Sequence, residues 1–280
     1  MSLGFSAIAR VVVPYGLPAL GGAWVERSGL VTLCLEGAMI FGAFAYAATD
    51  LRTGSVGMAF VAAAAAGMSL GVVHAFLTLK AGVDAMVSGL ALNAFAYSLT
   101  RFALKVMYES SSNSPALGHI AVHAWVGPLL LALLLVLVGA SSWVLARTGF
   151  GLRIRAAGDA PEASRAVGGQ PERIRMLMAG LGCGLAALGG ASLVADLHKF
   201  QSGMSAGRGF LALVAVVIAK NHPGRAVLVA SAFGALELWS GRFQSAFPRL
   251  AELAPALPYL LALLVVASPR RSARSLSRGL

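Results

Sequence analysis

A polar stretch from residue 147 to 175 separates two long apolar runs, and this alternation constrains the fold more than any other feature. The stretch reads RTGFGLRIRAAGDAPEASRAVGGQPERIR, in which six arginines accompany three acidic residues. The flanking runs, about 126–146 and 176–197, are long enough to cross the ~30 Å hydrocarbon core of a bilayer. Because basic loops are retained in the cytoplasm, we expect 147–175 to be a cytoplasmic loop.

Composition agrees with membrane insertion, since 58% of the residues are hydrophobic, 12% are charged and mean hydropathy is +0.79. A soluble domain of this size has too little interior for so much apolar surface. The net charge of +11 does not indicate nucleic-acid binding, because the basic residues cluster at loop ends and in the tail 270–280. The prediction is an all-α integral membrane protein forming a single transmembrane domain over residues 1–280.

Apolar windows predict a polytopic bundle of about eight to nine segments. The segments 208–221 and 256–269 are too short for a straight crossing, so we expect broken or re-entrant helices there. The stretch 108–125 contains no Lys or Arg, as expected for an outer loop, and the basic tail 270–280 returns to the cytoplasm. The windows lie at about 5–24, 28–48, 57–79, 83–107, 126–146, 176–197, 208–221, 225–241 and 256–269.

Within the cytoplasmic loop, the letters PEASRAVG predict a short helix at about 157–170. We expect Asp159 to open this helix near its N-terminus and Gly168 and Gly169 to close it. A structured, basic element that protrudes from the bilayer indicates a binding partner on the cytoplasmic side.

Glu36 is an acidic residue within the second apolar window, where a carboxylate costs about 2.5–3.5 kcal/mol to insert. Ser28, Thr32 and Glu36 are spaced four residues apart, which predicts that they share one helical face. Two interpretations stay open. Glu36 either lines or gates a path through the membrane, or it caps a neighbouring broken helix by accepting that helix's free N–H groups.

A second series of four-residue spacings, Gly89, Asn93, Tyr97 and Arg101, predicts a stripe that faces the protein interior. Asn93 either contacts a solute or makes hydrogen bonds between helices. We expect Arg101 to mark the outer membrane interface.

Other motifs exclude several kinds of site. The glycine-rich stretch GLGCGLAALGG follows no strand and has small-x-x-x-small spacing, so it predicts close helix packing. No Walker motif is present, which indicates that the chain does not hydrolyse ATP itself. Neither Cys34 with Cys183 nor His119 with His123 has the further ligands of a metal site, and no acid pair indicates an enzyme.

Four motifs occur in order over about residues 15–240, and they read ALGGAWVERSGLVTLCLEGAMIFGAF, KAGVDAMVSGLALNAFAYSLTRF, GFGLRIRAAGDAPEASRAVGGQPERIRMLMAGLGCGLAALGGA and GMSAGRGFLALVAVVIAKNHP. The chain resembles the membrane subunits of ABC importers of the branched-chain amino acid and ribose type, and is most similar to nucleoside and purine uptake permeases. Thr32 stands where relatives often have Asn and Ala219 where many have Gly, so the exact solute is left open.

The resemblance implies a permease of a bacterial inner membrane that holds no cofactor, because ATP and Mg²⁺ are bound by partner ATPases. It also implies a second permease subunit, identical or homologous, and an extracytoplasmic binding lipoprotein. Residues that match the family's coupling segment, which docks on the ATPase, are Gly158, Asp159, Ala160, Pro161, Glu162, Ala163, Ser164, Arg165, Ala166 and Gly168. Candidates for the translocation path are Thr32, Glu36, Gly89, Asn93 and Tyr97.

The function expected from this resemblance is ATP-driven uptake, in which the short cytoplasmic helix moves with the ATPases and the spans rock around a central cavity. An ABC permease for sugars or branched-chain amino acids is an alternative within the family. An ion-coupled transporter that works without an ATPase is the alternative from another class. It would require an intramembrane acid or His relay, for which the only candidates within the spans are Glu36 and Glu237.

Overall fold

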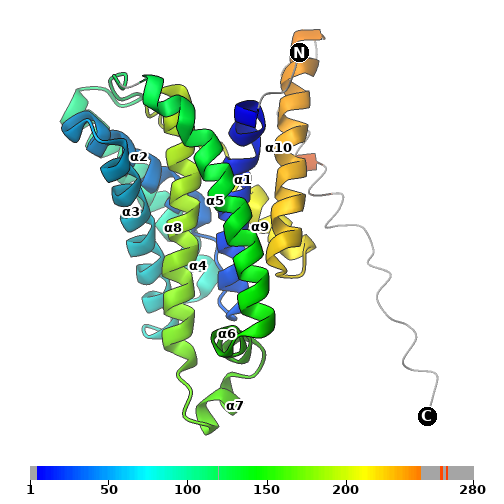
Figure 1. Cartoon of the computed structure of the whole chain (residues 1–280). Coiled ribbons are helices and arrows are strands. Elements are labelled where there is room, and N and C mark those ends of the chain that lie inside the picture. The colour runs from blue at the N-terminus through cyan, green and yellow to red at the C-terminus, as the bar shows by residue number, and fades with distance from the viewer. Residues whose placement is uncertain (1–4, 119, 247–258, 261–262, 264–280) are drawn as a thin grey trace. The chain divides into compact units, whose positions relative to one another are not determined.

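The computed structural model describes residues 5–118, 120–246, 259–260 and 263, which form helices joined by short loops (Figure 1). Within this part of the chain the all-α prediction is confirmed. The helices are α1 (Phe5–Arg27), α2 (Leu35–Thr53), α3 (Val56–Leu79), α4 (Ala85–Tyr108), α5 (Ile120–Arg147), α6 (Gly149–Asp159), α7 (Pro161–Ala166), α8 (Pro171–Leu197), α9 (Arg208–Ile218) and α10 (Pro223–Ala246).

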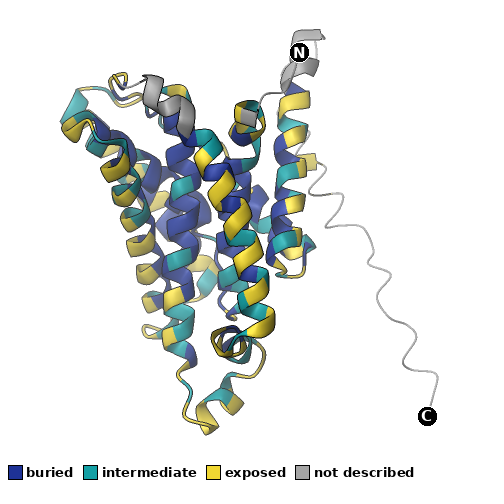
Figure 2. Cartoon of the chain, in the orientation of Figure 1, coloured by how far each residue is buried: buried dark blue, intermediate teal, exposed yellow. Residues whose placement is uncertain are grey.

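Helix α8 is the central helix, and it packs against α1, α2 and α3. Buried residues follow one another along most of its length (Figure 2). A Cβ added at Gly190 would collide with the Met39 carbonyl of α2, and one added at Gly71 of α3 would collide with the Ala179 carbonyl. The glycine-rich stretch of α8 therefore brings helix backbones into contact, which confirms the packing role predicted for it.

The outward faces of the bundle are apolar, which suits contact with lipid rather than water. Helix α3 exposes Val61 and Phe76, and α5 exposes Leu129 and Val136, each with more than half of its surface accessible. Large apolar patches of this kind are uncommon on soluble monomers. Helices long and apolar enough to cross a bilayer span Ser6–Arg27, Val56–Leu79, Val126–Arg147 and Pro171–Leu197.

The second apolar window, 28–48, is helical only from Leu35, because residues 28–34 form an irregular segment that connects α1 to α2. The prediction that Ser28, Thr32 and Glu36 share one helical face is therefore wrong. Pattern alone does not reveal the break, since SGLVTLC is as apolar as the helix that follows it. Irregular backbone at this depth is tolerated where protein supplies its hydrogen bonds.

Helix α9 has 11 residues, so it covers about 16 Å and only part of a bilayer. This confirms the prediction of a short segment at 208–221. Most of the other short window, 256–269, lies outside the described residues.

By internal contacts the chain divides into two units, Met1–Ala235 and Leu236–Leu280. The first contains the helices that build the site described below. The described part of the second consists of the final turns of α10 and residues 259, 260 and 263. The predicted basic tail 270–280 lies outside the described residues, and the single domain over 1–280 stays a prediction.

Candidate functional site

Glu36 lies at the first turn of α2 with 1% of its surface exposed. Its carboxylate accepts the backbone N–H groups of Gly207 at 2.9 Å and Gly209 at 2.7 Å, which belong to the start of α9. The hydroxyls of Tyr97, at 2.9 Å, and Ser205 donate to the same carboxylate. Glu36 therefore caps α9, as one of the two sequence interpretations requires, and the positive end of that helix offsets its charge.

The start of α9 reaches Glu36 because its backbone comes unusually close to α2. A Cβ at Gly209 would lie 2.6 Å from the Glu36 Cα, a distance that real Cβ atoms do not adopt. Gly207 precedes the helix with φ +77°, in the left-handed region that glycine enters without strain. The two helix starts thus meet at one carboxylate, from segments about 170 residues apart in sequence.

Asn93, which is 5% exposed on α4, holds the irregular segment 28–34 to the start of α2. Its side-chain oxygen accepts the Gly37 N–H at 2.7 Å, and its amide nitrogen donates to the Leu33 carbonyl at 2.9 Å. One turn earlier, a Cβ at Gly89 would lie 2.7 Å from the Leu33 Cβ. Gly89, Asn93 and Tyr97 therefore face the protein interior as predicted, and they meet the region around Glu36.

Thr32 is buried in the same irregular segment, but its contacts differ from those of Glu36. Its backbone N–H reaches the Glu26 carboxylate at 3.3 Å, and its hydroxyl lies 3.5 Å from the Leu30 carbonyl. Of the predicted path residues, Glu36 and Tyr97 are joined by a hydrogen bond, and Thr32 makes no hydrogen bond to either.

Sequence reasoning missed two sets of residues around this site. His74 of α3 is fully buried, and its ring nitrogens lie 2.9 Å from the Val31 carbonyl and 3.1 Å from the Ser88 hydroxyl. Ser205, Gly207 and Gly209 were also missed. The glycines of GMSAGRG before an apolar run were a signal for an irregular helix entry, whereas nothing in the sequence pairs His74 with residue 31.

A polar pocket of about 470 Å³ lies one helical turn along α4 from Tyr97, at Arg101. Met204, which lines it, immediately precedes the Ser205 that contacts Glu36. Arg101 is exposed, so the predicted interior stripe ends before it. Hydroxyl and amide side chains dominate the lining, which comprises Arg101, Ser111, Ser112, Asn113, Gln201, Ser202, Gly203 and Met204.

The predicted cytoplasmic helix 157–170 is two helices. Asp159 is the last residue of α6 and does not open α7, which begins at Pro161, the position where a missing N–H is harmless. Gly168, with φ +80°, ends the turn after α7 as predicted. The separate helix α6 was not expected, although its buried Gly151, Ile154 and Ala157 follow helical spacing.

Helix α7 is exposed, with none of its residues buried. Arg165 donates to Glu162 at 2.6 Å and to Glu172 at 2.5 Å, which ties α7 to the start of α8. The hydrogen bonds to Glu172 and then to Glu162 raise the pKa of the Arg165 guanidinium. The three residues between Pro161 and Arg165 lie on this braced turn.

The junction between α6 and α7 touches the irregular segment that leads to Glu36. Arg175 donates from Nε to the Ser28 carbonyl at 3.1 Å and from Nη2 to the Ala157 carbonyl at 2.8 Å. A Cβ at Gly158 would lie 2.5 Å from the Arg27 carbonyl oxygen, so the two backbones are in contact there. The junction between α6 and α7 and the buried site are therefore joined by direct contacts through residues 28–34.

Comparison with known proteins identifies relatives over most of the chain. Residues 4–266 match the family described as branched-chain amino acid transport system / permease component. The chain is 32% identical to the guanosine ABC transporter permease protein NupQ of Bacillus subtilis over 84% of its own length and 80% of the relative's.

Further relatives differ in their solutes. The chain is 29% identical to the nucleoside ABC transporter permease protein NupC of Lactococcus lactis, over 91% of this chain and 88% of the relative. It is 32% identical to a putative glucose ABC transporter permease of Haloferax volcanii, over 82% of this chain and 74% of the relative. No solved structure gives a significant match to the chain.

Proposed function

The chain belongs to the family of branched-chain amino acid transport system permease components, and from this premise we propose that it is the nucleoside-conducting subunit of an ATP-driven importer. It is an ABC transporter permease and not an enzyme. The observation that carries the choice of solute is the 32% identity to a guanosine permease over 84% of the chain. Similar identity to a putative glucose permease makes sugars the second candidate.

The polar pocket beside Arg101 supports a hydroxylated solute. Ser111, Ser112, Asn113, Gln201 and Ser202 offer hydroxyl and amide groups, which suit the hydroxyls of a ribose or a hexose. A branched-chain amino acid has an apolar side chain that this lining does not match.

We assign the translocation path to Thr32, Glu36, Gly89, Asn93 and Tyr97. Two helices begin inside the protein at Glu36, which is the arrangement by which many transporters build a central site. The hydrogen bonds of Tyr97 and Ser205 to Glu36 join α4, α2 and the residues 205–207 that lead into α9. A shift of one of these segments therefore changes the positions of the others. Glu36 acts as the cap that keeps these helix starts together.

We assign coupling to the exposed elbow formed by the end of α6, by α7 and by Gly168, which comprises the coupling residues predicted above. Arg175 connects this elbow to the irregular segment 28–34, because it donates hydrogen bonds to the carbonyls of both Ala157 and Ser28. ATP-driven movement of α7 would displace residues 28–34 and, through them, the start of α2. The partners are an ATPase and a solute-binding protein, with a second permease subunit, in a bacterial cytoplasmic membrane.

Reconstituted uptake tests the proposed solute. The permease, its ATPase and its binding protein are placed in liposomes with internal ATP, and uptake of labelled guanosine is measured against excess uridine, glucose or leucine. Of the three competitors, we expect only uridine to reduce guanosine uptake. Competition by glucose and not uridine would assign the chain to sugars, and uptake by the isolated chain under an ion gradient would refute ATP-driven transport.

Crosslinking tests the elbow separately. Ala163 is exposed on α7, so Ala163→Cys is made in a chain carrying Cys34→Ala and Cys183→Ala. We expect a crosslink to the ATPase in complexes that retain uptake, and none from a control cysteine at exposed Thr53, at the end of α2. Absence of the Ala163 crosslink in active complexes would refute the docking of α7.

A further inference from the structure

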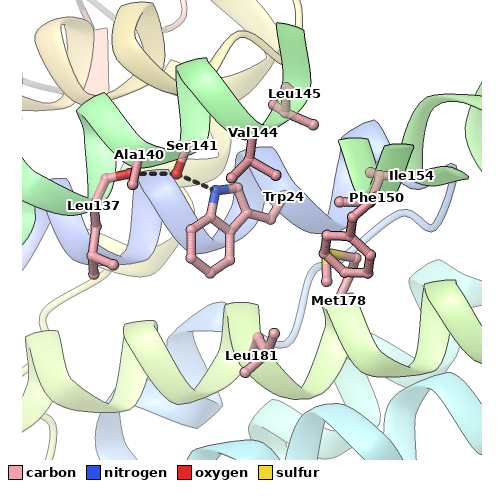
Figure 3. A pocket seen from close by; sticks show the side chains of 10 residues that line it. All are labelled: Trp24, Leu137, Ala140, Ser141, Val144, Leu145, Phe150, Ile154, Met178 and Leu181. Carbon is pink, nitrogen blue, oxygen red and sulfur yellow. Dashed lines mark hydrogen bonds between the residues drawn. The ribbon is translucent and has the colours of Figure 1, made fainter. Parts of the chain in front are cut away.

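An apolar cavity of about 210 Å³ opens where α1, α5, α6 and α8 meet. Trp24 forms one wall, and its indole N–H is already bonded to the Ser141 hydroxyl at 2.9 Å, so the ring face remains as lining (Figure 3). Leu137, Val144 and Leu181 line it from the two longer helices on either side. No charged residue contributes to the lining, so the cavity suits a hydrocarbon chain.

A basic pocket of about 240 Å³ lies beside this cavity and shares Leu145 with it. Arg27, Arg155, Lys220 and His222 line it, and no acidic side chain does. Arg27 has a long ion pair of 3.8 Å with Asp159 outside the lining. Among the described residues, the buried Nε of Arg155 has no hydrogen-bond partner. A basic cluster with this one long ion pair and no acidic lining residue fits an anion.

The two sites lie at the depths that a phospholipid requires. The basic pocket is at the ends of α1 and α5, on the same side as the arginine-rich loop and therefore at the cytoplasmic surface. The apolar cavity extends from Leu145 to Leu137 of α5, a rise of roughly 12 Å towards the bilayer centre. A headgroup at the first site is thus continuous with an acyl chain in the second.

We propose that the Arg27–Arg155–Lys220 pocket and the Trp24 cavity together form a binding site for one anionic phospholipid of the inner leaflet. Its phosphate lies among the basic side chains, and an acyl chain lies against Trp24 and Leu181. Lipid bound here bridges α1, α5, α6 and the turn from α9 to α10. Basic pockets at cytoplasmic helix ends recognise anionic headgroups in this way.

Native mass spectrometry of the complete transporter tests the site. Complexes are exchanged into nanodiscs of phosphatidylcholine with or without phosphatidylglycerol, and retained phosphatidylglycerol is counted. We expect Arg155→Gln with Lys220→Gln to weaken retention roughly 30-fold, from about one kcal/mol for each basic contact. Arg153→Gln, an exposed arginine of the same helix that does not line the pocket, is the matched control and should retain the lipid.

A second variant tests the acyl chain independently of the charges. Ala140 lines the apolar cavity, so Ala140→Phe fills it and should reduce phosphatidylglycerol retention while leaving the basic pocket intact. Unchanged retention in this variant would overturn the proposed acyl site.

Two further outcomes would overturn the proposal. Inorganic phosphate that displaces the lipid or reproduces its thermal stabilisation would identify a free-anion site. Loss of ATPase subunits from the Arg155→Gln, Lys220→Gln complex in both lipid compositions would show that these residues contact protein instead. A Tm increase with phosphatidylglycerol that appears in the wild type and Arg153→Gln alone supports the lipid.

Discussion

Glu36 accepts four hydrogen bonds on two oxygens, and three of the donors lie within residues 205–209, at the start of α9 and just before it. This explains how a carboxylate is retained inside a membrane protein. Its insertion penalty is offset by backbone N–H groups that would themselves be costly to bury without an acceptor. The Glu36 carboxylate and the start of α9 therefore stabilise each other.

We predict that Glu36→Gln destabilises the protein more than Tyr97→Phe. The glutamine amide presents a donor where Gly207 or Gly209 already donates, so a buried N–H is left unsatisfied at about 1–3 kcal/mol. Tyr97→Phe removes one donor, worth about 0.5–1.5 kcal/mol. Thermal unfolding in nanodiscs measures both. A Glu36→Gln midpoint equal to that of the wild type would contradict the capping role.

The proposed coupling of α7 to residues 28–34 depends on Arg175. Arg175→Gln removes the bonds to Ser28 and Ala157, so we predict ATP hydrolysis that is no longer matched by uptake. Neighbouring Arg173 is exposed, and Arg173→Gln should leave the ratio of solute to ATP unchanged. Parallel loss of both activities in Arg175→Gln would indicate misfolding or failed docking instead of uncoupling.

At the scale of elements, helix positions followed from hydropathy, but the start of α2 did not. The windows 57–79 and 83–107 lie within two residues of α3 and α4. Residues 28–34 were predicted to be helical, because the residues that hold them in an irregular conformation are distant in the sequence. Asn93, His74 and Arg175 satisfy their backbone groups from α4, α3 and α8, which no local pattern can indicate.

In the site, residues on one helix were predictable from the sequence, and residues brought together from distant segments were not. Gly89, Asn93 and Tyr97 follow from the spacing of a single helix, whose period is fixed. Ser205 and Gly207 required knowledge of which segment meets Glu36, across a sequence separation of about 170 residues. Asp159 was misplaced because it favours helix starts, whereas Pro161 two residues later determines where α7 begins.

The contact between α1 and α8 depends on glycine, which gives a prediction for these elements. A Cβ at Gly182 would lie 2.5 Å from Val25 and 2.6 Å from the Gly21 carbonyl oxygen, so Gly182→Ala should lower stability by about 1–3 kcal/mol. Gly139 of α5 has no neighbour within 4 Å, and Gly139→Ala should be neutral or slightly stabilising. Thermal midpoints in nanodiscs provide the comparison, and equal effects would contradict tight packing.

For the whole molecule, the structure contrasts a closely packed group of helices with elements that are exposed or short. Helices α1, α2 and α3 surround α8 through glycine contacts, whereas α7 is exposed and α9 is short. Close packing of this kind changes between discrete arrangements and does not deform smoothly. We therefore expect α2 and α8 to keep their mutual contact during transport, while the elbow moves relative to them.

The thiols of Cys34 and Cys183 report on this closely packed group, because they lie 3.4 Å apart between α2 and α8 and both are fully buried. We predict that a maleimide labels neither thiol with or without trapped ATP, and that labelling begins only as the helices unfold. A cysteine at exposed Thr53, the non-docking control position above, reacts immediately in both states and shows that the reagent is active. Labelling of Cys34 or Cys183 in one nucleotide state alone would mean that the α2–α8 contact opens, and alternating access would then have to run through it.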